Sequence, residues 1–188
     1  MDFIHIYIFE DDLSQSALFY NLAEKVFSES IIYNIVTYED TLDIIDKIKF
    51  PAVFLIDIFL EGMNGLNILK TIQGKYPNEI FYTIIISGSS DKDTLFQAMK
   101  TGADEFIPKP ISPENFLLRL LNIKRYLELQ LINNAQKTEI EKLNENFYSL
   151  RSQMIELIKL FQKIRVPESE KLIQRLKKAA VWIFQNIS

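Results

Sequence analysis

Hydrophobic positions along the first part of the chain follow two alternating patterns. Short apolar runs rich in isoleucine, phenylalanine and valine are typical of buried strands. Between them lie stretches in which apolar residues recur every three or four positions, as in helices packed on a core. We predict strands over residues 4–9, 31–36, 52–56, 80–86 and 105–107. We predict helices over residues 14–27, 41–48, 66–76, 91–100 and from 112 onward.

Five strands alternating with five helices predict an α/β fold. Strands joined through helices pair in parallel, and the helices cover both faces of the sheet. Residues 1–125 are therefore predicted to form a doubly wound, five-stranded parallel sheet. Helix signals agree with this prediction: Asp91 is a candidate N-cap with Gly102 just past the helix end, and Ser112 precedes Pro113 at the first helical position.

Composition excludes several kinds of site. The absence of cysteine excludes disulfides, thiolate zinc sites and cysteine nucleophiles. His5 is the single histidine, which excludes a histidine-rich metal site, and we expect it to pack rather than to catalyse. No apolar run approaches the roughly 20 residues that span a bilayer, and no basic segment precedes an apolar run at the N-terminus. We expect a cytoplasmic protein.

Charge is distributed unevenly along the chain. Residues 1–111 carry eight lysines and arginines against 17 aspartates and glutamates, whereas residues 112–188 carry 13 against eight. The acidic first part suits a divalent-cation site. The basic charges of the second part are spread around predicted helices, which favours solvated helix faces over a nucleic-acid surface.

Polar residues follow four of the predicted strands. They are Glu10, Asp11 and Asp12 after the first strand, Asp57 after the third, Ser87 after the fourth and Lys109 after the fifth. Parallel strands bring such residues to one edge of the sheet. Clustered carboxylates repel one another unless a cation joins them, and hard oxygen ligands suit Mg²⁺. We therefore predict phosphoryl chemistry, with Asp57 as nucleophile and with Lys109 and the metal balancing charge.

Four segments resemble the CheY-like receiver domains of two-component response regulators. They are residues 6–12 (IYIFEDD), 55–60 (LIDIFL), 62–66 (GMNGL) and 102–110 (GADEFIPKP). The resemblance covers about residues 3–125 and implies a phosphorylation-dependent signalling switch rather than an enzyme acting on a separate substrate. It also implies a sensor histidine kinase or phosphotransfer protein as the phosphoryl donor. The lack of a long apolar run separately predicts no membrane partner.

The resemblance implies a role for each matching residue. Asp57 would accept the phosphoryl group, and Lys109, with a cis bond to Pro110, would pair with its oxygens. Ser87 and Phe106 would move in the switch. The implied Mg²⁺ ligands are Glu10, Asp11, Asp57 and the main-chain carbonyl of Phe59. Glu61 replaces a common proline and Ser87 a commoner threonine, while the bulk of Phe59 is expected to slow loss of phosphate.

Residues 126–188 are predicted to form a helical output or dimerisation region. This part of the chain resembles no family. The absence of proline and glycine between Glu114 and Val166 predicts one helix to about residue 165, and a second helix follows over about 168–187. Apolar residues from Ile140 to Ile164 keep a three-four spacing typical of a coiled coil or bundle. The polar stretch 133–138 is a register-setting layer, a hinge or a helix break.

Several readings of the tail and of the site remain open. The tail could form a coiled coil, a hairpin or, as we prefer, a four-helix bundle from two hairpins, which predicts a homodimer and a downstream protein partner. An RNA-binding, antitermination-type output is the alternative. A phosphohydrolase would also use Asp57 as nucleophile, but Phe59 occupies the position of its second acid. A vestigial adaptor conflicts with the intact set of site residues.

Overall fold

The computed structural model describes residues 3–88, 92–163 and 169–186. The chain divides into two compact units, Met1–Ile132 and Asn133–Ser188. Among the helices so described, none has both the length and the apolar character needed to cross a membrane.

The first unit is built on a parallel sheet of five strands. The strands are β1 (His5–Phe9), β2 (Ile31–Ile35), β3 (Ala52–Asp57), β6 (Phe81–Ser87) and β7 (Glu105–Pro108). Their order is β2-β1-β3-β6-β7, with every neighbouring pair parallel. The predicted doubly wound fold is confirmed. The central strand β3 is buried along its whole length, as its unbroken apolar sequence predicts.

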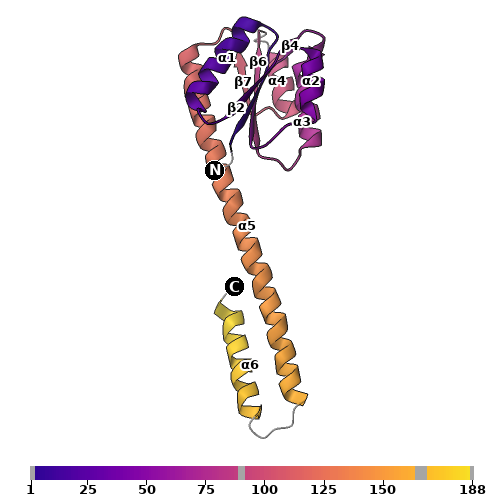
Figure 1. The fold of residues 1–188 in the computed structure, drawn as a ribbon, viewed down its shortest axis with the longest axis vertical. Helices are drawn as coiled ribbons and strands as arrows, with labels where there is room; N and C mark the ends of the chain where they lie inside the picture. The colour runs from indigo at the N-terminus through magenta and orange to yellow at the C-terminus, as the bar shows by residue number, and fades with distance from the viewer. Residues whose placement is uncertain (1–2, 89–91, 164–168, 187–188) are drawn as a thin grey trace. The chain divides into compact units, whose positions relative to one another are not determined.

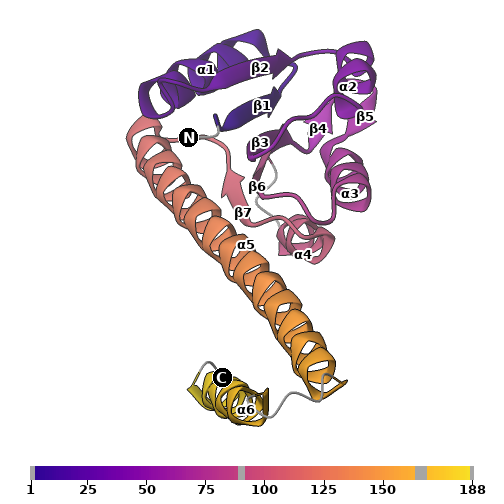
Figure 2. The same ribbon diagram turned by 60° about the horizontal axis from the view of Figure 1, so that its bottom comes forward.

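Helices cover both faces of this sheet (Figures 1 and 2). They are α1 (Leu13–Val26), α2 (Tyr38–Ile45), α3 (Gly65–Lys75), α4 (Lys92–Thr101) and α5 (Pro113–Lys163). On one face, α1 and the start of α5 enclose a core that includes Phe19, Leu55 and Phe116. On the other face, α2, α3 and α4 enclose a second core that includes Phe54 and Ile68.

Side-chain caps set the starts of several helices. Asp12 accepts hydrogen bonds from the main-chain nitrogens of Ser14 and Gln15, which caps α1. Ser112 accepts one from the nitrogen of Asn115, so the predicted cap of α5 is confirmed. Asp91, the predicted cap of α4, lies outside the described residues. Gly102 follows α4 with a φ of 97°, a conformation that glycine adopts without a steric penalty.

Two local features differ from the sequence prediction. Helix α2 begins at Tyr38 rather than at Thr41, because the hydroxyl of Thr37 accepts a hydrogen bond from the nitrogen of Asp40 and caps an earlier turn. A small antiparallel pair, β4 (Phe59–Leu60) with β5 (Met63–Asn64), follows β3 and was not predicted.

The second unit contains the end of α5 and α6 (Ser169–Asn186). Helix α5 continues through residues 133–138, so the predicted long helix is confirmed and a helix break there is wrong. Ile164 and the predicted turn at Val166 and Pro167 lie outside the described residues. Several apolar side chains of this unit are at least half exposed: Ile140, Leu143, Leu150, Leu157, Leu160, Val181 and Trp182.

Candidate functional site

The side chain of Lys109 links two buried carboxylates at the carboxyl edge of the sheet. Its Nζ donates to Asp57 Oδ2 at 2.5 Å and to Glu10 Oε2 at 2.9 Å. Asp57 is 5% exposed and Glu10 is 1% exposed. Three residues from the ends of β1, β3 and β7 therefore form one charged cluster, as the strand-end pattern predicted for them.

Neighbouring backbone fixes this cluster. Phe59 N donates to Asp57 Oδ1 at 3.0 Å, which leaves the other carboxylate oxygen to Lys109. Lys109 N donates to the carbonyl of Ser87 at 2.7 Å and so continues the pairing of β7 with β6. The Lys109–Pro110 peptide bond is cis, as the family resemblance implied.

Burial and charge act against each other at this cluster. Burial raises the pKa of Glu10, and its hydrogen bond from Lys109 offsets only part of that effect. Burial also acts to lower the pKa of Lys109, but the bonds to Asp57 and Glu10 together outweigh it and raise the pKa of Lys109. The lysine is thus held in its charged form between two groups that need a cation.

The carboxylate of Asp11 bonds to a neighbouring turn. Its Oδ2 accepts a hydrogen bond from Glu61 N at 2.8 Å, in the turn between β4 and β5. Over the residues that the structure describes, no three acidic or imidazole groups lie close enough together to hold a metal ion. The donor chemistry of Glu10, Asp11 and Asp57 nevertheless fits Mg²⁺, since all three supply hard carboxylate oxygens on adjoining strand ends.

The two expected switch residues lie on neighbouring strands. Ser87 is fully buried at the end of β6, where it pairs with Pro108. Phe106 on β7 is partly buried and packs against the core beneath α2, α3 and α4. The structure thus places a hydroxyl at the sheet edge beside Lys109 and an aromatic ring farther along the adjoining strand.

Gly65 is a site residue whose role the sequence analysis missed. A Cβ atom at this position would lie 2.0 Å from the carbonyl oxygen of Asp57 and 2.7 Å from Ile56 Cγ2. Gly65 N also donates to the carbonyl of Ile58 at 2.9 Å. Only glycine lets the start of α3 approach the backbone of Asp57 this closely. The signal was a glycine at a helix start, where capping or charged residues are commoner.

Comparison with known proteins identifies the first unit. The family model of the response regulator receiver domain matches residues 6–121. The DNA-binding transcriptional regulator NtrC of Escherichia coli K12 is 34% identical over 103 residues, 53% of this chain and 22% of that protein. A cyclic di-GMP phosphodiesterase of Thermotoga maritima is 21% identical over 178 residues, 89% of this chain and 46% of that protein.

A solved structure shows the same fold. The CheY-like receiver domain protein of Methanospirillum hungatei aligns with a TM-score of 0.58 at 24% identity, covering 70% of this chain and 99% of that one. The chain spans less than half the length of the two curated relatives above, which extend into parts that it does not match.

Proposed function

The chain belongs to the response regulator receiver family, and from that premise we propose that Asp57 is its phosphorylation site. The donor would be a phosphohistidine on a sensor histidine kinase or a phosphotransfer protein. The observation that carries the proposal is the position of Lys109, shared between the buried carboxylates of Asp57 and Glu10. A charged lysine in this place can bind the oxygens of an incoming phosphoryl group.

The transfer step needs little chemistry from the protein beyond positioning. A carboxylate oxygen of Asp57 attacks phosphorus, the bond from phosphorus to the histidine nitrogen breaks, and an acyl phosphate forms. Glu10, Asp11, Asp57 and the carbonyl of Phe59 would hold Mg²⁺, which supplies positive charge to the phosphoryl oxygens when bound. Asp11 would first release the nitrogen of Glu61.

The new charge would then bias the conformation of the domain. A phosphoryl group adds roughly two negative charges at the sheet edge. Lys109 would exchange its bond to Glu10 for the phosphoryl oxygens, and the hydroxyl of Ser87 would turn toward them. Phe106 would move inward behind Ser87, which shifts the population between two packings of this region.

The tail would carry the output as a dimerisation or partner-binding element. Within the second unit, Phe147, Met154 and Ile158 are half-buried and Ile173 is buried. Leu143, Leu150 and Leu157 instead remain 61%, 65% and 50% exposed. The second unit thus buries part of its apolar seam and leaves a stripe exposed, which supports a four-helix bundle made from two hairpins.

Phosphorylation at Asp57 can be tested with a small-molecule donor. We expect acetyl phosphate with Mg²⁺ to add one phosphoryl group to the intact chain, detected by mass spectrometry, and Asp57→Asn to abolish the addition. Asp93→Asn, at an exposed aspartate on α4, is the matched control and should be phosphorylated normally. Normal labelling of Asp57→Asn would refute the assignment.

The effect of phosphorylation on assembly can be read from solution mass. We propose to measure light scattering with and without beryllofluoride and Mg²⁺, because beryllofluoride imitates the phosphoryl group without being hydrolysed. A dimer whose stability changes with beryllofluoride supports a tail controlled by Asp57. A chain that stays monomeric in both states would leave the phosphorylation site intact and remove dimerisation as the output.

Phe59 is proposed to prolong the phosphorylated state. Its side chain is 60% exposed, two positions after Asp57. A bulky apolar ring there would hinder the water that hydrolyses the acyl phosphate. We expect Phe59→Asn to shorten the lifetime of phosphorylated protein, measured by loss of label over time, while Leu60→Asn serves as the neighbouring control. An unchanged lifetime in Phe59→Asn would end this idea.

A further inference from the structure

The outer edge of β2 is open to pairing. Within the described sheet, β2 stands at one end of the strand order and its partner is β1. Glu10 N donates to the carbonyl of Ile35 at 3.2 Å, so the main-chain groups of Ile35 face β1. Along a strand, the main-chain N–H and C=O groups of successive residues point alternately to one side of the strand and to the other. The N–H and C=O groups of Ile32 and Asn34 therefore face away from the sheet.

Strand β2 lacks the features that usually prevent strand addition. Natural edge strands are protected by proline, by charged side chains or by a bulge. Residues 31–35 read IIYNI, without proline or charge, and pair with β1 one residue to one residue. Ile31 at the start of the strand is 48% exposed. The edge is thus a template for another extended segment.

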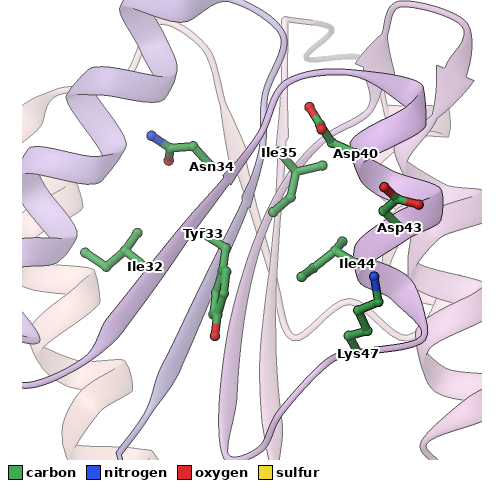
Figure 3. A pocket seen from close by; sticks show the side chains of 8 residues that line it. All are labelled: Ile32, Tyr33, Asn34, Ile35, Asp40, Asp43, Ile44 and Lys47. Atoms are coloured by element: carbon green, nitrogen blue, oxygen red, sulfur yellow. The ribbon is translucent and has the colours of Figure 1, made fainter.

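A groove lies beside this edge, between β2 and α2. Its volume is about 440 Å³, and its lining residues are Ile32, Tyr33, Asn34, Ile35, Asp40, Asp43, Ile44 and Lys47. In Figure 3, Ile44 projects from α2 toward β2, from which Tyr33 and Ile35 extend, and the carboxylate of Asp43 lies on α2 above the nitrogen of Lys47. The ring of Tyr33 stacks on Tyr7 with centroids 4.7 Å apart, which fixes an apolar floor.

The α2 side of the groove is acidic. Helix α2 and its C-cap carry Glu39, Asp40, Asp43 and Asp46 and no basic residue. Asp46 pairs with Lys75, and Asp40 accepts a hydrogen bond from Thr37 Oγ1 at 2.8 Å. The side chain of Asp43 makes no hydrogen bond or ion pair within the described residues. It lies in the last turn of the helix, where the helix dipole disfavours a carboxylate and favours a cation.

We propose that this groove binds an extended, positively charged peptide segment of a partner protein, which adds to the edge of β2 as a further strand. Main-chain groups of the peptide pair with Ile32 and Asn34. The aliphatic stem of a lysine or arginine on the groove side packs on Tyr33, and its charged end reaches Asp43. Charge selects a basic segment because the lining has two carboxylates against the single ammonium of Lys47.

The test uses the full chain and a labelled peptide of alternating valine and lysine, with a valine–glutamate peptide for comparison. We expect the lysine peptide to bind, measured by fluorescence anisotropy, more weakly as salt rises, and the glutamate peptide not to bind. Asp43→Lys should weaken binding by about tenfold or more, whereas Asp93→Lys on α4 should leave it unchanged. Equal affinity in these two variants would overturn the proposal, as would absence of binding.

The backbone part of the proposal has its own readout. Hydrogen exchange at the amides of Ile32 and Asn34 should slow when the peptide binds, and unchanged exchange there during binding would refute strand addition. Asn34→Pro removes one outward donor, at an edge position where proline is tolerated, and should weaken binding. If that variant does not fold, amide exchange and Asp43→Lys decide. Self-association of the chain that Asn34→Pro abolishes would assign the edge to a second copy and overturn the proposal.

Discussion

A single helix, α5, is used in opposite ways by the two units of the chain. In the first unit its residues Phe116, Leu120 and Leu127 are completely buried against the sheet. In the second unit Leu143 and Leu150, equally apolar, are 61% and 65% exposed. The receiver closes its core within one chain, whereas the tail leaves apolar side chains exposed along the part of α5 that the structure describes. Helical periodicity alone does not distinguish these two situations.

The largest expected effect concerns the closed core. Phe116 packs on Phe19 with ring centroids 5.2 Å apart. We expect Phe116→Ala to lower the free energy of unfolding of the receiver by about 3–5 kcal/mol, because it leaves a cavity. Leu118→Ala, at a 59% exposed position on the same helix, should change it by about 0.5 kcal/mol or less. Urea unfolding would measure the free energy of unfolding of both variants. Similar losses in Phe116→Ala and Leu118→Ala would contradict the distinction between buried and exposed positions of α5.

The next effect concerns the exposed apolar stripe of the second unit, which includes Leu143, Leu150 and Leu157. We expect Leu150→Asp to disrupt the dimer proposed above without changing the unfolding of the receiver. Burying a leucine contributes about 1.5–3 kcal/mol, and each dimer would lose two such side chains. Sedimentation equilibrium would measure the change, with Ser149→Asp, at the adjacent exposed position, as control. An equal loss of association in the control would mean that charge rather than the seam is responsible.

A smaller effect follows from Tyr7, which is buried in the receiver. Burial raises the pKa of Tyr7 to about 12, and its hydroxyl accepts a hydrogen bond from Lys49 N at 2.8 Å. Tyr7→Phe should be less stable by about 1 kcal/mol at neutral pH. Because the folded pKa is raised, wild-type stability should fall relative to this variant, by about 2–3 kcal/mol, as pH rises from 10 to 12. Urea unfolding at several alkaline pH values would reveal a constant difference if Tyr7 is not responsible.

The smallest effect concerns the start of α5. Ser112 Oγ accepts a hydrogen bond from Asn115 N, so Ser112→Ala should cost the receiver about 1 kcal/mol. Ser149→Ala, in the helix interior, should not destabilise the protein, since alanine has the higher helix propensity. Thermal unfolding would compare them. A larger loss in the interior variant would place the stability of α5 in the tail rather than at its cap.

The sequence was informative where a pattern repeated along the chain determined the structure. Buried strands left unbroken apolar runs, and the charged residues after them could be assigned to one edge, so Glu10, Asp57 and Lys109 were correctly predicted to meet. The β4 and β5 strands have two residues each, too few to show a period. The early start of α2 could have been read from Thr37 and Asp40, whose spacing is that of a capping pair.

The position of Asp11 shows what a sequence pattern leaves undetermined. Its place in the chain fixes its Cα at the sheet edge, but the carboxylate can bond either to the site or to the nearby nitrogen of Glu61. The structure has the second arrangement. That choice depends on the turn between β4 and β5, which the apolar pattern did not predict.

The absence of a side chain at Gly65 has an evolutionary consequence. Alanine and serine are reached from glycine codons by one nucleotide change, yet even their first carbon would collide with the carbonyl of Asp57. In a library covering every single substitution, position 65 should therefore be depleted nearly as strongly as position 57. Selection would act at position 65 although glycine has no functional group, because any added side chain would collide with the backbone of Asp57.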